Sequence, residues 1–476
     1  MFRALSKFAK TSCVFGALAL AVPSLNENFD QSISGRYIPE DKQVHRWSTL
    51  TKVGFRFAFC YLMLYCLCNG DSTAWGVLPY IGDYITEWLA YPFVMGGQYL
   101  AQHLFHVQGP GSHIHETISG DTAIAWIADG IMLVLAFVGA VLWNVFDWRR
   151  PHYQTLSAWL RFTIRLTLGI TMIWFGFIKL FPRQMQLPGI AILNEPVGHM
   201  SPMSMVWTMI GMSPAYESIC GAAEIAAALL ILFRRTALAG AILTAFVTVN
   251  VMLYNFFFDV PVKLFATHLL IMALFVVLPD VQPLIDFFWR HKQSAPTGVW
   301  VPPANRPLFR RMTVAIEGLF LLSCLLTVLY EEIPLYRKQV AAQKEKTPLR
   351  GGWRLDGMEK PAGTDVNAVL MGNGLPMTEL YIDTLIRGSV RSSDGALWRA
   401  SITPDRSTQT LQISIRGINS LKYAATLPDI DHLVLTPPGK DAAKEPLLRF
   451  TRIPLETTYP LMTRGFHWVN EWGLER

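Results

Sequence analysis

The chain has 476 residues, of which 51% are hydrophobic and only 16% are charged, a balance that places most of it in a lipid bilayer. The net charge of +6 is modest, and no run of Lys and Arg is long enough to indicate a nucleic-acid partner. The six cysteines include no Cys-x-x-Cys pair, which argues against thiol–disulfide exchange and favours buried apolar thiols.

The chain begins with a basic segment, residues 1–48. Its first 22 residues join a basic start to a short apolar run, which is typical of a signal peptide cleaved near Ala19-Leu20-Ala21. The run is too short to span a bilayer, and the basic residues that follow favour the cytoplasm. We expect an uncleaved amphipathic segment on the cytoplasmic face, with signal-peptide cleavage as the alternative.

Seven apolar segments each approach the roughly 20 residues that a membrane helix needs. They lie near residues 50–69, 123–146, 159–181, 216–233, 236–257, 263–280 and 309–330. Lys and Arg are absent between Asn69 and Asp121 and are scarce in every second loop after it. Because positively charged loops stay in the cytoplasm, we expect the N-terminus on the cytoplasmic side of the membrane and everything beyond Glu332 outside.

The membrane part divides into three stretches. Two helices with an outer, aromatic-rich interfacial segment take residues 49–158, a four-helix bundle takes 159–282, and a cytoplasmic loop with the last helix takes 283–333. Ser119-Gly-Asp121-Thr122 precedes the second span, and its Asp and Thr are expected to cap that helix.

A polar linker leads to a C-terminal β-domain at 345–476. Short alternating runs near 380–384, 396–402, 410–415, 421–427, 432–435 and 447–452 are separated by Asp-Gly, Pro-Asp and Pro-Gly turn signals. Such spacing favours a small antiparallel barrel or sandwich. Its Gly352-Trp353 start is similar to the opening of lipocalin-type barrels, and we expect the aromatic tail from Arg464 to close the barrel.

Four histidines end the outer interfacial segment, as His103-x-x-His106 and His113-x-His115. Histidine is a common zinc ligand. However, the first spacing suits a helix and the second a strand or loop, and no Cys lies nearby. We assign no metal site; these four are the candidates, and ordinary interfacial and loop histidines are the alternative.

Polar residues interrupt the outer halves of the third to sixth spans. Glu224 lies about two turns inside the fourth span, on one stripe with Glu217 and Gly221, and needs a proton, a hydrogen bond or a cation from another helix. We expect seven residues to line a polar pocket open to the outside and covered by residues 181–214. They are Lys179, Glu224, Asn250, Asn255, Asp259, Lys263 and His268.

A structural network that holds four helices in register is the alternative to a pocket. In that case Asp259 caps the sixth span and Lys263 reaches the lipid headgroups.

The four-helix part resembles the DoxX family of bacterial membrane proteins. Three features carry the likeness: GITMIWFGFIKL at Gly169–Leu180, Gly221-Ala-Ala-Glu224 with its apolar run up to Phe233-Arg-Arg235, and the final helix pair. Tyr254–Lys263 and Arg464–Glu471 resemble a subgroup that adds an N-terminal membrane part and a C-terminal β-domain.

The resemblance implies membrane redox chemistry, because DoxX relatives include a thiosulfate:quinone oxidoreductase subunit and accessory proteins of oxidative-stress complexes. It therefore implies a quinone as cofactor and redox subunits as partners within the bilayer. It supplies no set of catalytic residues, and whether the chain is an enzyme stays open. Two alternatives remain: a lipid or small-molecule binding or transport module that uses the β-domain, and a non-catalytic assembly scaffold.

Overall fold

The computed structural model of the chain describes thirteen stretches, and the statements below concern them alone. They are residues 46–69, 75, 81–107, 120–233, 235–294, 307–344, 347–359, 375–384, 386–405, 410–415, 421–437, 446–455 and 459–463. The expected leader at 1–22, His113, His115 and the tail from Arg464 lie outside them. The chain forms two compact units, one of residues 1–93, 128–170 and 275–324, the other of 94–127, 171–274 and 325–476.

Helices make up the described membrane part. The longer ones are α2 (Thr49–Cys68), α3 (Ile81–His103), α4 (Ala123–Phe146), α5 (Gln154–Leu180), α8 (Pro214–Leu232), α9 (Ala237–Phe257), α10 (Lys263–Val277), α12 (Pro307–Thr327) and α13 (Ile333–Lys344). The shorter ones are α6 (Ile190–Leu193), the 3₁₀ turns η3 (Val197–His199) and η4 (Leu278–Asp280), α7 (Pro202–Gly211), α11 (Val281–Phe288), the π-helical turn η5 (Val328–Glu332) and α14 (Pro460–Thr463).

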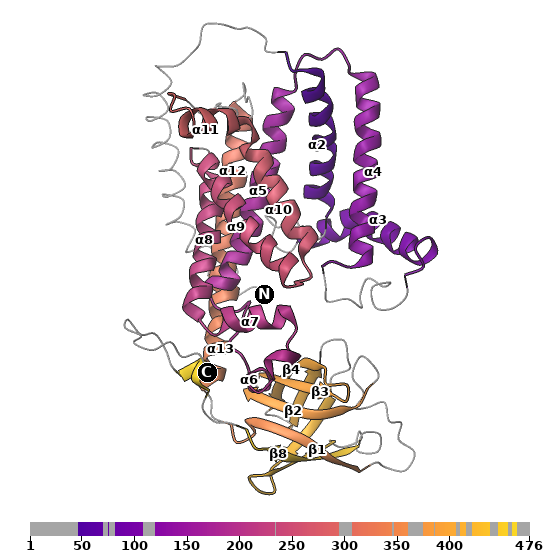
Figure 1. The fold of residues 1–476 in the computed structure, drawn as a ribbon, viewed down its shortest axis with the longest axis vertical. Helices are drawn as coiled ribbons and strands as arrows, with labels where there is room; N and C mark the ends of the chain where they lie inside the picture. Colours follow the sequence, from indigo (N-terminus) through magenta and orange to yellow (C-terminus); the bar gives the residue numbers. More distant parts are fainter. Residues whose placement is uncertain are drawn as a thin grey trace, which may run out of the picture. The chain divides into compact units, whose positions relative to one another are not determined.

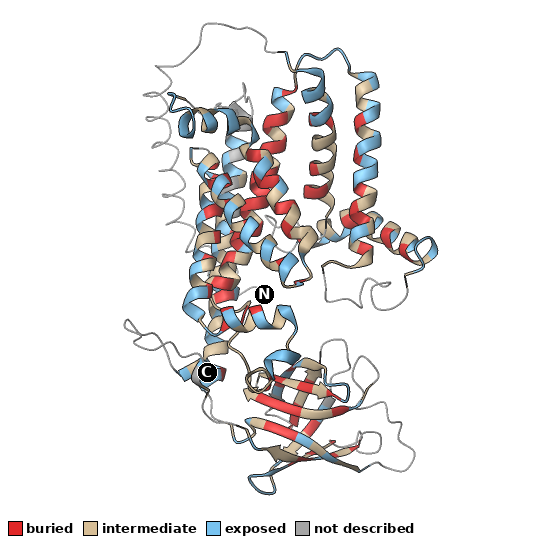
Figure 2. Ribbon diagram, viewed as in Figure 1, coloured by how far each residue is buried: buried red, intermediate tan, exposed pale blue. Residues whose placement is uncertain are grey.

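Seven of the helices in the described stretches are long and apolar enough to cross a membrane, which confirms the expected number. They are Thr49–Cys68, Ala123–Phe146, Gln154–Leu180, Pro214–Leu232, Ala237–Phe257, Lys263–Phe288 and Val314–Lys344. In Figure 2 these helices carry exposed residues along part of their surface, as helices that face lipid do. The chain is a membrane protein with seven candidate spans.

In the first unit, α2 packs through Arg56 on the segment between α4 and α5. Its guanidinium donates hydrogen bonds to the Tyr153 hydroxyl (3.0 and 2.7 Å) and to the carbonyl of Asp147 (2.6 Å). Arg56 is buried. These hydrogen bonds give Arg56 a packing role near the start of the first span.

In the second unit, α8 and α9 form an antiparallel hairpin whose backbones approach closely at Gly240. A Cβ atom built there would lie 2.1 Å from the backbone nitrogen of Ile231, so only glycine fits. Figure 1 shows α7 lying crosswise to these two helices.

The C-terminal domain is a closed barrel of eight antiparallel strands, in which each strand pairs with the next and β8 pairs with β1. The strands are β1 (Gly351–Glu359), β2 (Met377–Thr384), β3 (Arg387–Ser392), β4 (Leu397–Asp405), β5 (Thr410–Ile415), β6 (Leu421–Thr426), β7 (His432–Thr436) and β8 (Leu447–Ile453). The barrel-or-sandwich alternative is thus resolved in favour of a barrel.

Side chains fill the barrel interior. Trp353, Tyr423 and Phe450 are buried in one apolar cluster with residues from all eight strands, and Figure 2 shows the buried residues along the strands. Trp353 donates its indole N–H to the carbonyl of Leu349 (2.8 Å), and the Arg452 guanidinium lies 4.2 Å from its ring centroid. An eight-stranded barrel is just wide enough for such a packed interior.

Candidate functional site

Two of the predicted site residues, Lys179 and Glu224, contact each other inside the second unit. The Lys179 ammonium lies 2.6 and 2.8 Å from the two carboxylate oxygens of Glu224, and both side chains are buried. Lys179 Nζ also lies 5.6 Å from the ring centroid of Phe175. The cation that Glu224 requires from another helix is therefore Lys179, at the last turn of α5.

Two glycines bring α5 and α8 close enough for this ion pair. A Cβ atom on Gly221 would lie 2.4 Å from the Leu180 nitrogen and 2.5 Å from the Gly176 carbonyl oxygen, and a Cβ on Gly176 would lie 3.0 Å from the Gly221 oxygen. Small residues allow such close helix contacts in membranes. The Ser218 hydroxyl adds a hydrogen bond to the carbonyl of Leu180 (3.0 Å).

Glu217 has a role that the sequence did not reveal. The expected stripe of Glu217, Gly221 and Glu224 is buried along α8. One oxygen of Glu217 accepts hydrogen bonds from the backbone N–H groups of Gln184 and Met185, each at 3.0 Å. The carboxylate therefore anchors the chain where it leaves α5, because those N–H groups follow the end of the helix.

The turn between α9 and α10 is held by Asp121. Its two carboxylate oxygens accept hydrogen bonds from the backbone N–H groups of Lys263 (2.7 Å) and Leu264 (3.0 Å), so Asp121 caps α10. Asp259, the cap of α10 in the alternative interpretation, does not cap it. Of the two residues expected to cap α4, Thr122 does so, its hydroxyl accepting the Ala125 N–H at 3.0 Å, whereas Asp121 caps α10 instead.

Asp259 instead lies on the surface, with 82% of its side chain exposed and a left-handed φ of 49°. The Lys263 ammonium lies 2.8 Å from Asp259 and 3.8 Å from Asp121, so it bridges the two carboxylates. Lys263 therefore belongs to a local group of ion pairs instead of reaching toward the lipid headgroups.

The other predicted residues of this turn have local contacts. Asn255 donates its side-chain N–H to the carbonyl of Val262 (3.1 Å), which closes the turn. The buried His268 places Nδ1 2.8 Å from the carbonyl of Leu264, one helical turn back. Asn250 is exposed on α9. The seven residues thus include one buried ion pair and one capped turn.

The two candidate metal ligands that the structure describes lie at the end of α3. The His103 ring stacks on Tyr99 with centroids 4.3 Å apart, and its Nδ1 lies 2.9 Å from the Tyr99 carbonyl oxygen. His106 is exposed with a left-handed φ of 49°. Within the described stretches, no group of three or more His, Cys, Asp or Glu residues has the spacing of a metal site.

A cavity of about 1640 Å³ lies elsewhere in the second unit. Its walls are the chain between Arg183 and Thr208, one side of α13, residues of strands β2 to β5 and the segment around α14. The segment 181–214, expected to be a cover, does line a cavity. The seven predicted residues do not line it.

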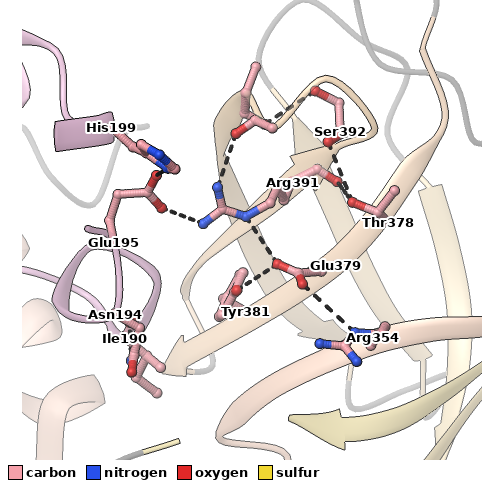
Figure 3. A network of polar contacts seen from close by, with 12 residues as sticks. Ile190, Asn194, Glu195, His199, Arg354, Thr378, Glu379, Tyr381, Arg391 and Ser392 are labelled. Carbon is pink, nitrogen blue, oxygen red and sulfur yellow. Dashed lines mark hydrogen bonds and ion pairs between the residues drawn. The ribbon is translucent and has the colours of Figure 1, made fainter. Parts of the chain in front are cut away.

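Hydrogen bonds and ion pairs attach this segment to the barrel wall, as Figure 3 shows for Arg391. The Arg391 guanidinium lies 2.5 Å from Glu195 and 3.0 Å from Glu379. Burial alone would lower the pKa of Arg391, but the hydrogen bond and charge of Glu195 together with Tyr381 outweigh burial, and the pKa is raised. Burial also raises the pKa of Tyr381, whose hydroxyl donates to Glu379, to about 12.

Asp383 on β2 makes a second attachment. Its carboxylate accepts the backbone N–H of Ile190 at 2.6 Å, at the start of α6, and lies 3.7 Å from the guanidinium of Arg387. Burial raises the pKa of Asp383, which the charge of Arg387 partly offsets. Asn194 at the end of α6 donates to the Tyr459 hydroxyl at 2.7 Å. Figure 1 shows α6 beside β2, consistent with these contacts.

The cavity combines positive charge with apolar surface. Five basic side chains and two carboxylates line it, an excess of three positive charges: Arg183, Lys338, Arg350, Arg387 and Arg399 against Glu195 and Asp383. Its apolar lining includes Trp207 and Met203 of α7 and Trp398 of β4. Such a lining suits an amphiphilic ligand that carries a polar or anionic end.

Comparisons with known proteins give a partial likeness to an uncharacterized protein. No family model and no solved structure matches the chain. Over 85 residues the chain is 36% identical to the uncharacterized protein YwoB of Bacillus subtilis (strain 168). That stretch is 18% of this chain and 55% of the relative, so the chain spans about half the length of the curated relative it matches.

Proposed function

We propose that the chain is a membrane-embedded binding protein that holds an amphiphilic molecule in the cavity between the segment 183–208 and the outer wall of the barrel. The observation that carries the proposal is the cavity itself, large enough for a lipid-sized molecule and lined by both cations and apolar side chains. Ligand sites of this kind combine an apolar lining with a few placed polar groups.

The position of the cavity along the chain supports a ligand taken from the membrane. Arg183 follows three residues after the end of α5, and Lys338 lies in the last candidate span. On α7, Val206 and Ile210 are buried, while Met205, Met209 and the C-cap residue Met212 are exposed at helical spacing. An exposed apolar stripe of this kind suits a helix lying in the membrane interface. We infer that the cavity opens where spans end.

The barrel interior is not where the ligand binds. Large side chains such as Trp353 and Phe450 fill it, so the described strands enclose a packed core instead of a lipocalin-like ligand cavity. The binding module that the sequence suggested as an alternative would therefore use the outside of the β-domain, not its interior. The barrel supplies one outer wall of the site, and the 183–208 segment supplies the other.

A quinone-linked accessory role in a membrane redox system is the second candidate. The resemblance to the DoxX family supports it, as does the buried Lys179–Glu224 pair within membrane-spanning helices, where ionisable residues usually serve function. A quinone is an amphiphile and is therefore one of the molecules that the cavity would suit. In this role the chain would act in the bacterial cytoplasmic membrane, with its barrel outside and redox subunits as partners.

The first test asks whether a ligand occupies the cavity. The full chain is purified in mild detergent, and its bound molecules are extracted and identified by mass spectrometry. Ser401→Trp, on the cavity wall formed by β4, should displace the ligand, whereas Thr426→Trp, exposed on β6 outside the cavity, should not. Equal ligand content in both folded variants would contradict the proposal. A co-purifying quinone, with a rise in melting temperature on adding quinone, would favour the redox role.

A further inference from the structure

The outer face of the barrel presents two guanidinium groups to the cavity. Arg399 on β4 is paired in register with Ser389 on β3, and Arg387 lies two residues before Ser389. Because side chains alternate along a strand, Arg387 and Arg399 project from the same face. Diagonal neighbours on one face of a sheet lie within reach of long side chains, so the two positive charges repel each other.

The carboxylates near this pair are already engaged. Asp383 lies 3.7 Å from Arg387 and also accepts the Ile190 N–H, so one carboxylate serves two partners. Burial lowers the pKa of Arg387; Asp383 acts against this, and the charge of Arg399 lowers the pKa further. The single negative charge of Asp383 therefore does not neutralise the two positive charges of Arg387 and Arg399.

The other carboxylate of the cavity lining, Glu195, and the nearby Glu332 outside that lining are also committed to other cations. Glu195 pairs with Arg391, and Glu332 pairs with Arg183. Lys338, Arg350 and Arg399 have no carboxylate within ion-pair distance among the residues that the structure describes. Three cations in one cavity thus form no ion pair with a described carboxylate, and Asp383, whose pKa the charge of Arg350 also lowers, is shared with Arg387.

We propose that this cavity binds the anionic headgroup of a phospholipid, with Arg387 and Arg399 holding the phosphate and Lys338 adding charge from α13. The inference rests on the proposed binding function and specifies its ligand class. Guanidinium groups bind phosphate through paired, charge-assisted hydrogen bonds. The acyl chains would lie along Met203, Trp207 and Leu335, which line the same cavity.

This charge pattern distinguishes an anionic lipid from a neutral amphiphile. A zwitterionic phosphatidylcholine headgroup carries no net charge and would leave the positive excess uncompensated. A quinone offers only neutral carbonyl acceptors. Binding of an anionic lipid is therefore expected to weaken as salt is added, because salt screens exposed charges such as Arg399.

The experiment uses the full chain in a neutral detergent, titrated with phosphatidylglycerol or with phosphatidylcholine of the same acyl chains. Binding is followed by tryptophan fluorescence, because Trp207 and Trp398 line the cavity, and by the melting temperature. Phosphatidylglycerol is expected to bind at least about tenfold more tightly. Arg399→Gln should remove most of that preference. Lys422→Gln, an exposed cation on β6 outside the cavity, should keep it.

Arg399 is the first choice because it is exposed and its removal leaves the Asp383–Arg387 contact intact. Arg387→Gln/Arg399→Gln is the second variant, and its melting temperature without lipid reports whether it folds. Loss of the preference in the Arg399 variant, with Lys422→Gln unchanged, supports the proposal. Inorganic phosphate that competes as strongly as the lipid would overturn it in favour of a free anion.

Two further outcomes separate this inference from the function on which it rests. If wild-type protein binds phosphatidylglycerol and phosphatidylcholine equally, with Ser401→Trp abolishing both, the headgroup assignment fails and the binding function stands. If neither lipid binds and Ser401→Trp changes nothing, both proposals fail.

Discussion

Lys179 and Glu224 form a buried ion pair between α5 and α8, with the ammonium 2.6 and 2.8 Å from the two carboxylate oxygens. Removing one partner of a buried ion pair leaves an uncompensated charge and destabilises a protein by about 3–5 kcal/mol, far more than the intact pair contributes to stability. We therefore expect Lys179→Met and Glu224→Gln each to lower the melting temperature of the detergent-solubilised protein. The double variant Lys179→Met/Glu224→Met should recover most of the loss.

The same variants separate an assembly scaffold from a redox role. A pair that only holds helices together can be replaced by apolar residues without loss of ligand or activity. If the double variant is stable but no longer responds to quinone, the pair acts in the chemistry. Single variants as stable as wild type would show that the pair is not an important packing element.

The close approach of α5 and α8 gives the second prediction. A Cβ on Gly221 would lie 2.4 Å from the Leu180 nitrogen, which is backbone and does not move easily. Gly221→Ala is therefore expected to destabilise the protein by about 1–3 kcal/mol, as overpacking usually does. Gly130→Ala on α4 is the matched control, because nothing lies within 4 Å of its added Cβ. Equal melting temperatures for the two variants would refute close packing at Gly221.

The third prediction concerns the cap of α10. Asp121→Ala removes the acceptor of two backbone N–H groups, Lys263 and Leu264, and is expected to cost about 0.5–2 kcal/mol. Asp259→Asn should change little, because that side chain is exposed and caps nothing. Hydrogen exchange at the first turn of α10 is the sharper measurement. Faster exchange in the Asp259 variant than in the Asp121 variant would reverse the assignment.

Helices and strands could be predicted where a short stretch of sequence is enough to determine them. Spans follow from the length of apolar runs, and most strands follow from their alternation. Strand β3 was missed because Arg-Gly-Ser-Val390-Arg-Ser offers a single large apolar residue, although its pairing with β2 and β4 makes it a strand. Gly388 stands at an inward position there, where a Cβ would lie 2.4 Å from the Tyr381 carbonyl oxygen.

Contacts between distant segments could not be predicted. Asp121 lies next to α4 in sequence and was expected to cap it, yet it caps α10, 142 residues away. The cavity could not be predicted for the same reason, because its walls come from a loop and from a domain that begins more than a hundred residues later. The hydrogen bond between Ile190 and Asp383, for example, joins positions 193 residues apart. Hydropathy patterns carry no information about which surfaces meet. Charge pairing across helices, as for Lys179 and Glu224, was accessible because an intramembrane carboxylate needs a partner.

The fourth prediction concerns the pH dependence of stability, to which two aspartates contribute with opposite signs. Burial raises the pKa of Asp383, with Arg387 opposing, so the folded chain holds this proton more tightly than the unfolded chain does. Its ionisation therefore costs stability as the pH rises through the folded pKa. Asp383→Asn keeps an oxygen for the Ile190 N–H and removes that cost. We therefore expect the melting temperature of the variant minus that of wild type to be more positive at pH 7 than at pH 4.

Asp429 provides the opposite case in the same domain. The Asp431 N–H and the His432 side chain lower the pKa of Asp429, so its contribution to stability is present above its ordinary pKa and is lost as the pH falls through the folded pKa. Asp429→Asn should therefore lower the melting temperature at pH 7 and have less effect at low pH. Both variants are measured in one detergent and at one ionic strength. A shift of the same sign for the two would show that burial does not control Asp383.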